Sequence, residues 1–509
     1  MPFIREFYID PGDAILEDVA SINIINNPPV GSIQGLVQNT VGIIGEFLKG
    51  PFATPTLEGS YASVKGDFGG YSSYLGDGDL SANGNGIAYL SGFTWGNIVV
   101  TRVNTEVGNV TYTLSAALAS DYLIPAGSRV GDGTNTYITD QDLTIAAGQT
   151  TGTVGISPAN AGTFTSLINS ITHVIDTPAG LGTSTLSVSN AAATTALNIS
   201  TAYTAAITAT LVYDGSPGSL INILFSARKD PAASQPTSGT GTVEPIRAGL
   251  ISNATTFALS AGARYAVTSV IRGTQKQAAL YCKQSSQNSY GQSDEREFFE
   301  YICGKWLSPE ANSTFELTPD VWMASILSQL PPWENPGQAT PYTAGILGLE
   351  SDLTAVYSVN DYITFEQNGI NALINDPSGL GIIFDQGFTG VNQTAYSANK
   401  RISRIRMQDY ITLSEAYGLA QFSKKLSTPA RQDALVGELN TFLLTEQSPQ
   451  NPELSHIAGY TLDAKSGNTD ASLAQGLFTV IQSVKTYSSL DSINIRSTVG
   501  EGVVIVAAT

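Results

Sequence analysis

The chain is poor in the residues that most often build catalytic and metal sites. Its 509 residues include only two cysteines and two histidines. Cys282 and Cys303 are too few for a disulfide framework. We expect two buried free thiols, and the alternative is a single bridge between them, which only the geometry can decide. His173 and His456 stand in no recognisable catalytic context, which argues against a histidine-based metal site or a Ser/His triad.

Charged residues are also scarce, and their signs are unbalanced. They make up 13% of the chain, about half the usual share, and the formal net charge is −19. An acidic chain repels phosphate groups, which argues against nucleic acid and against docking on anionic lipid. Lysine is missing between Lys65 and Lys229, where Thr, Ala, Ser and Gly dominate. This composition is typical of β-rich proteins of virions and of extracellular assemblies.

Long hydrophobic runs and nucleotide motifs are missing as well. The first residues, 1–10, lack the basic start and apolar run of a signal peptide. No stretch of about 18 apolar residues predicts a transmembrane helix. No phosphate-binding loop occurs. The segment 77–83 resembles a calcium loop but lacks its central glycine and closing glutamate. We therefore expect no cofactor, no metal, no enzymatic activity and no direct membrane insertion.

What the chain does contain is enough apolar sequence for two to four domains. Apolar residues make up 42% of it, and its length exceeds one ordinary core. We predict a multidomain α+β fold in five parts. These are an extended N-terminal arm (1–35), a central αβ core domain in two pieces (36–104 and 206–399), an inserted all-β domain (105–205), and a C-terminal domain of helices and antiparallel strands with a terminal strand arm (400–509).

Several segments carry clear local signals. Ser60–Phe68 reads as a short helix. Arg401–Ala416 opens a longer helix, and Thr428–Pro429 begins another with proline at its first position. Ser293–Trp306 also predicts a helix, because Asp294 and Glu297 have the spacing of a capping box. In addition, apolar residues recur on one face of such a helix.

Several segments of the chain, taken in their order along the sequence, resemble those of a known protein family. They are Val41–Thr56 with Ala62–Gly70 and Asn97–Val103, then Leu211–Phe225, then Pro319–Leu327 with Pro331–Pro336 and Gly345–Glu350, then Asn368–Ile374 with Gly379–Asp385, and the C-terminal part from Arg401. In this order they resemble the contractile tail sheath proteins of myophage tails, R-type pyocins and related injection systems. Asp385–Phe388 replaces the Trp-Gly-Ala-Arg usual in that family, and the arginine-rich turn before Pro331 is missing.

The resemblance implies a structural role, with the inserted domain (105–205) facing outward from the assembly. Sheath subunits polymerise as a helical stack of hexameric rings around an inner tail tube, and contraction drives that tube through a cell envelope. The partners implied are further copies of the chain, the inner tube protein, and the baseplate and tail terminator proteins. The location implied is a virion tail or injection-system particle, assembled after synthesis in the host cytoplasm. The sequence does not separate a phage tail from a cellular injection system.

Two short apolar segments are candidates for strand exchange between subunits. One contains Ile22 and Ile24, and the other contains Val503, Val504, Ile505 and Val506. An exposed apolar strand edge invites pairing with another chain. The alternative is that each strand pairs within its own subunit.

The densest basic cluster is a candidate for contact with the tube. It consists of Arg401, Arg404 and Arg406, and we group it with Lys424 and Lys425. In an acidic chain these cations would suit an acidic tube surface. The alternative is ordinary solvation of a helix surface. For the whole chain, the competing hypothesis is a surface-layer or adhesin-like protein, which also favours Thr, Ala, Gly and Asn.

Overall fold

The computed structural model divides into two compact units, Met1–Leu426 (unit 1) and Ser427–Thr509 (unit 2), which we describe separately. It describes all residues except 1–32, 34, 37, 72–85, 105, 160–165, 214–219, 230–244, 261–262, 270–292, 302–303, 311, 313, 338–345, 350–356, 376–380, 392–398 and 488–509. Cys282, Cys303 and the calcium-like loop at 77–83 therefore lie outside the described residues.

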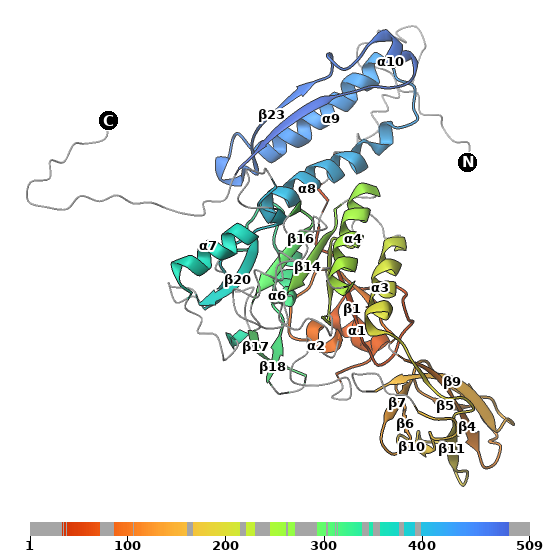
Figure 1. Cartoon of the computed structure of the whole chain (residues 1–509). Coiled ribbons are helices and arrows are strands. Elements are labelled where there is room, and N and C mark those ends of the chain that lie inside the picture. Colours follow the sequence, from red (N-terminus) through yellow and green to blue (C-terminus); the bar gives the residue numbers. More distant parts are fainter. Residues whose placement is uncertain are drawn as a thin grey trace, which may run out of the picture. The chain divides into compact units, whose positions relative to one another are not determined.

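An eight-stranded sheet forms the centre of unit 1 (Figure 1). Its strands, in spatial order, are β2 (Thr56–Glu58), β3 (Ile98–Arg102), β1 (Val41–Gly45), β13 (Ile223–Ser226), β14 (Tyr265–Ser269), β16 (Glu297–Tyr301), β20 (Ile370–Asn375) and β21 (Ile382–Phe384). The six inner strands pair in parallel, and β2 and β21 are antiparallel at the two edges. The core is thus a mixed α/β domain, as predicted, and its sheet is mainly parallel, which the prediction did not specify.

Helices cover both faces of this sheet. One face packs on α1 (Tyr61–Phe68), α2 (Gly86–Leu90), α6 (Asp320–Gln329), α7 (Val359–Asn368) and the start of α8 (Ile402–Leu419); the other packs on α3 (Ile199–Ala209) and α4 (Pro245–Ser260). Strand β1 shows the consequence, because Ile43 joins one cluster of buried side chains and Ile44 joins the other. The predicted helix at 60–68 is confirmed, with the Ser60 side chain capping α1 by accepting from the backbone N–H of Ser63 at 3.2 Å.

The helix predicted over Ser293–Trp306 is wrong. This segment contains β15 (Ser293–Asp294), then β16, then β17 (Gly304–Leu307). All five residues of β16 are buried, and the strand lies between β14 and β20. A central strand covered on both faces shows no alternation of polar and apolar residues, so its sequence cannot be told from a buried helix by periodicity.

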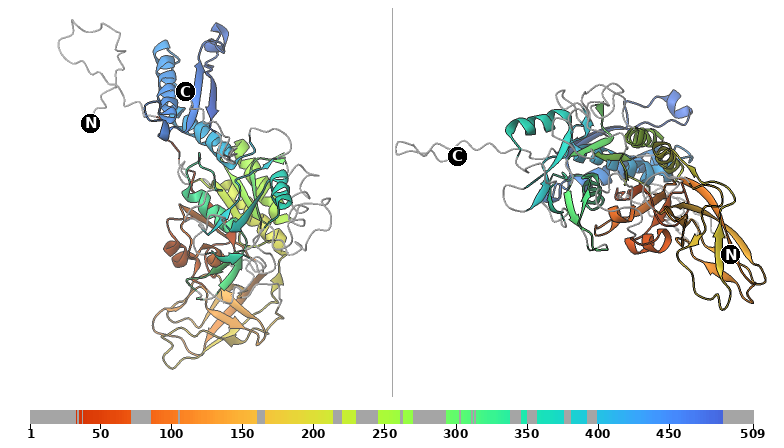
Figure 2. Two further views of the ribbon diagram at one scale, coloured as in Figure 1. Left: turned by 90° about the vertical axis from the view of Figure 1, so that its left-hand side faces the viewer. Right: turned by 60° about the horizontal axis from the view of Figure 1, so that its bottom comes forward.

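The inserted domain is a separate antiparallel sheet (Figure 2). Its six-strand path is β10 (His173–Val174), β6 (Arg129–Gly131), β7 (Thr136–Thr139), β9 (Thr151–Pro158), β4 (Glu106–Leu114) and β11 (Leu186–Ser189); β12 (Thr195–Ala196) also pairs with β4, and β5 (Tyr122–Ile124) pairs with β8 (Leu143–Ile145). The predicted boundary at residue 205 falls inside α3, which packs on α4 and β1 of the core. The all-β insert therefore ends near Ala196.

Smaller sheets complete unit 1. β17 pairs with β18 (Thr314–Leu317) and β19 (Ile346–Leu349), and β15 pairs with β22 (Gly390–Val391). Helix α8 belongs to unit 1, so the division between the two units falls at 426/427 and not at 400.

Unit 2 contains one long helix and a two-stranded antiparallel sheet. Its elements are α9 (Pro429–Gln447), β23 (Ile457–Asp463), α10 (Asp470–Ala474) and β24 (Ile481–Thr486). The predicted start of α9 is confirmed: Thr428 caps it and proline stands in its first turn. Helix α9 packs against β23. Across the described parts of both units, no helix combines the length and apolarity needed to cross a membrane.

Candidate functional surfaces

The basic cluster predicted to face a tube is spread over different environments. Arg401 precedes α8, where its guanidinium carbon lies 4.4 Å from the centre of the Phe388 ring, and it donates to Gln386 at 3.0 Å. Arg404 is partly exposed on the first turn of α8. Lys424 and Lys425 are exposed after the end of that helix. These four cations are accessible in unit 1 to differing degrees.

Arg406 is the exception, and its assignment to a tube-facing surface has to be corrected. Its side chain is 1% exposed and donates through Nη2 to the carbonyl oxygens of Leu327 and Leu330, at 3.0 and 2.9 Å. Burial lowers the pKa of the guanidinium to about 10, so the group stays charged at neutral pH. Arg406 caps the end of α6 from within the core. The sequence could not show this, because Arg404 and Arg406 look alike until the buried face of α8 is known.

The core sheet carries a set of buried ion pairs that the sequence did not reveal. Arg228 contacts Glu46 at 2.8 Å, and Arg247 contacts the two carboxylate oxygens of Glu297 at 2.7 and 3.2 Å. Lys229 pairs with Asp320, which is 0% exposed. A small pocket lies beside them, lined by Ser226, Arg228, Lys229, Ile246, Arg247, Leu250, Thr268 and Ser269. Since each of its three cations faces a buried carboxylate, the pocket has no spare positive charge for an anionic ligand.

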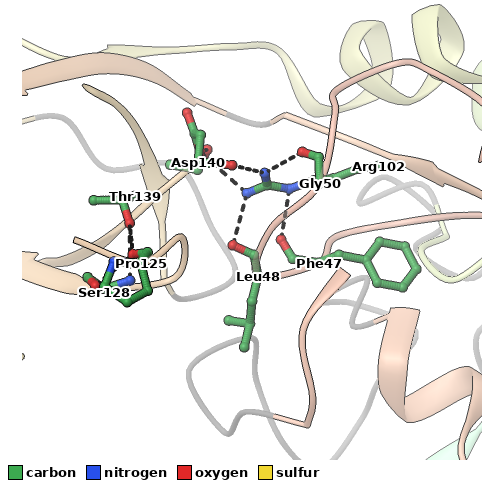
Figure 3. Close-up of polar contacts among 9 residues, drawn as sticks. Phe47, Leu48, Gly50, Arg102, Pro125, Ser128, Thr139 and Asp140 are labelled. Atoms are coloured by element: carbon green, nitrogen blue, oxygen red, sulfur yellow. Dashed lines mark hydrogen bonds and ion pairs between the residues drawn. The ribbon is translucent and has the colours of Figure 1, made fainter. Parts of the chain in front are cut away.

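One charged residue joins the core sheet to the inserted domain (Figure 3). Arg102, the last residue of β3, is 1% exposed. It donates through Nε to the carbonyl oxygen of Phe47 and through Nη1 to that of Gly50, both at 2.9 Å, with a longer contact to Leu48 at 3.4 Å. Its Nη2 also reaches the Asp140 carboxylate of the inserted domain at 3.4 Å. Burial raises the pKa of Asp140, and the Arg102 charge opposes that rise.

The partner side of this junction is fixed by its own hydrogen bonds. Thr139, next to Asp140, donates to the carbonyl oxygen of Pro125 at 2.9 Å and accepts from the backbone N–H of Ser128 at 3.1 Å (Figure 3). Ser157 donates to the Asp140 carboxylate. The carboxylate that Arg102 meets is therefore held in place by the insert. We did not identify this junction from sequence, since residues 102 and 140 share no local motif.

In unit 2, the two-stranded sheet is the feature most relevant to assembly. Among the described residues, β23 pairs only with β24, and β24 only with β23. Side chains along β24 alternate between exposed and half-buried. An isolated two-stranded sheet has marginal stability. The outer edge of each strand presents backbone hydrogen-bond donors and acceptors to which another strand can pair. The segments predicted to exchange between subunits, with Ile22, Ile24, Val503, Val504, Ile505 and Val506, lie outside the described residues.

The two histidines lie in different units. His173 is exposed on β10, and His456 contacts Glu446 through Nδ1 at 2.7 Å within unit 2. In the portion of the chain that is described, no group of three or more His, Cys, Asp or Glu side chains is placed to hold a metal ion.

Solved structures of contractile sheath proteins share the fold of this chain. The chain is similar to the helical sheath of the anti-feeding prophage in its contracted state, with a TM-score of 0.54 and 10% identity over 94% of this chain and 99% of that one. It is also similar to the contracted PVC sheath complex of an extracellular contractile injection system, with a TM-score of 0.51 and 10% identity over 92% and 94%.

A third similar chain comes from the contracted baseplate structure of the anti-feeding prophage, with a TM-score of 0.53 and 12% identity over 92% of this chain and 94% of that one. No protein-family model and no curated protein sequence matches this chain. At such identities the similarity establishes the fold, and the function has to be argued separately.

Proposed function

We propose that this protein is the structural subunit of a contractile sheath. Copies would stack as hexameric rings in a helical tube around an inner tail tube, and contraction would drive that tube through a cell envelope. The shared fold of sheath proteins over nearly the whole chain supports this proposal. Baseplate and tail terminator proteins would contact the two ends of the tube, in a virion tail or an injection-system particle.

The observation that carries the proposal is the two-stranded sheet of unit 2. Its outer edges can accept further strands, and the chain contains an uncharged apolar segment, 502–508, that suits this role. Strand addition forms backbone hydrogen bonds along a whole edge, so it links subunits strongly without requiring large side-chain complementarity. A head-to-tail contact forms a ring when its rotation closes and a helical filament when it does not, so such contacts within and between rings would build a tube.

The energy for contraction would be stored in the assembled lattice. The sequence contains no nucleotide motif. We propose that the extended tube is metastable, and that added strands keep neighbours connected while the remaining interfaces repack. In this account the exchanged strands act as hinges, and the folded units move as rigid bodies.

Arg401, Arg404, Lys424 and Lys425 remain our candidates for a surface that faces an acidic inner tube. Glutamate at both Lys424 and Lys425 should weaken decoration of purified tubes, because it replaces attraction by repulsion. The matched control is glutamate at both Arg431 and Lys465, which makes the same change in net charge elsewhere. Equal decoration by the two double variants would remove this part of the proposal.

The direct test of the function is to express the protein alone and view it by negative-stain electron microscopy. The proposal predicts tubes or stacked rings, on its own or after addition of the inner tube protein. Monodisperse particles under both conditions would contradict it and would favour a surface-layer or adhesin-like protein.

A further inference from the structure

The segment that precedes the central sheet lies along helix α8. We call residues 33–38 the N-terminal strap; Ile33, Gly35, Leu36 and Gln38 of this strap are described. The backbone N–H of Leu36 donates to Ser414 Oγ at 3.0 Å, across 378 positions of sequence. A hydroxyl on a helix surface thus satisfies a backbone donor that belongs to no sheet.

Three more contacts follow the same face of α8. Arg406 Nη2 lies 3.5 Å from the carbonyl oxygen of Gln38. Gly35 passes so close to Tyr410 that a Cβ at position 35 would overlap the tyrosine hydroxyl. A Cβ at Gly418 would lie 2.7 Å from Cγ1 and 3.0 Å from Cα of Ile33.

The four residues of α8 that contact the strap lie on one face of the helix. Arg406, Tyr410, Ser414 and Gly418 follow one another at intervals of four, so they form a single ridge on α8. From the first to the last the helix rises about 18 Å. The contacts of the described strap residues run from Gln38 beside Arg406 to Ile33 beside Gly418. The strap therefore runs antiparallel to the ridge.

The chain is also fixed just beyond the strap. The carbonyl oxygen of Thr40 accepts from the backbone N–H groups of Asn222 and Ile223 at 3.0 and 3.1 Å, and the N–H of Val41 donates to Asn97 at 2.8 Å. Without the ridge, a force applied through residues 1–32 would act directly on β1, which lies between β3 and β13. With the ridge, α8 receives that force first.

We infer that the ridge of Arg406, Tyr410, Ser414 and Gly418 is an anchor for the N-terminal strap. The anchor protects the central sheet from load that a neighbouring subunit applies through residues 1–32. The anchoring contact is a property of the folded chain, and its load-bearing role rests on the proposed function. Gly418 has a specific part, because it is the residue whose missing side chain admits the strap.

Hydrogen exchange of the full-length protein tests the anchor without any assembly. Alanine favours helix more than glycine or serine. Ser414→Ala should therefore strengthen α8 if the ridge has no other role. The anchor predicts instead that exchange of the 33–38 peptide becomes at least tenfold faster in Gly418→Val and faster in Ser414→Ala. Ala416→Val, at an exposed position of the same helix, is the control and should match the wild type.

Exchange at 33–38 that stays at the wild-type rate in both Gly418→Val and Ser414→Ala would overturn the anchor. Assembly then tests the load. We expect Gly418→Val to form fewer or broken tubes than Ala416→Val, and tubes indistinguishable from wild type would overturn the load-bearing role. If the wild type forms no tubes with or without the inner tube protein, the proposed function fails, whereas the exchange result stands by itself.

Discussion

The central sheet of unit 1 and the small sheet of unit 2 differ in how far each is completed by the described chain. The first has eight strands, helices on both faces, antiparallel strands at its edges and ion pairs buried against it. The second has two strands and a single long helix packed on β23. A sheet of the first kind is stable by itself, whereas one of the second kind gains most from an added strand. The small sheet of unit 2 is therefore the place in the described chain where an added strand would bring the largest gain in stability.

The largest loss of stability in the eight-stranded sheet should come from removing the ion-pair partner of one of its buried charges. Arg247→Ala leaves Glu297, which is 0% exposed, without its cation, and should cost about 3–5 kcal/mol of unfolding free energy. All four tryptophans lie in unit 1, so tryptophan fluorescence during urea denaturation measures the loss. Lys65→Ala, which removes the partly exposed pair with Glu310, is the control and should cost less than about 1 kcal/mol. Similar losses in both variants would contradict this account of the core.

A smaller effect should appear with pH at the edge strand β21. Asp385 follows this strand, and burial raises its pKa to about 6. The folded state therefore binds this proton more tightly than the unfolded state does, so its contribution favours folding below pH 4 and is lost as the pH rises through 6. Asp385→Asn should flatten the change in stability between pH 4 and 7 by no more than about 3 kcal/mol. An unchanged pH profile in this variant would show that Asp385 does not titrate abnormally.

The smallest effect concerns unit 2 alone. Ser448 ends α9 with φ = +40°, a left-handed conformation that glycine adopts without strain. Ser448→Gly should stabilise unit 2 by about 0.5–1 kcal/mol, measured as slower hydrogen exchange in α9. The tryptophan-reported transition of unit 1 should not move. A loss of protection in α9 would contradict the assignment of this cap.

The sequence predicted the elements whose signals are local. Ser60 before α1 and Thr428–Pro429 before α9 are capping residues that act within one turn of the helices they start. The all-β character of the insert was also predictable, because its composition and its alternating strands differ from the rest of the chain. Its end was misplaced only because α3 follows the last strand at once.

The errors arose where tertiary contacts decide the outcome. Glu297–Tyr301 became a central strand because β14 and β20 pair with it on both sides. Arg406 was assigned to the surface by its charge, but it satisfies carbonyl oxygens at the end of α6. The junction of Arg102 with Asp140 joins two domains through residues with no shared pattern. The predicted exchange strands and tube-facing cations remain predictions.

Strand addition to unit 2 is the central claim, and deletion of residues 500–509 tests it most directly. We expect the shortened protein to keep the wild-type tryptophan-reported unfolding transition but to form no tubes or rings by negative-stain electron microscopy. A synthetic peptide of residues 500–509 should then bind it and slow hydrogen exchange in β23 or β24. Tubes formed by the shortened protein as readily as by the wild type would contradict the account.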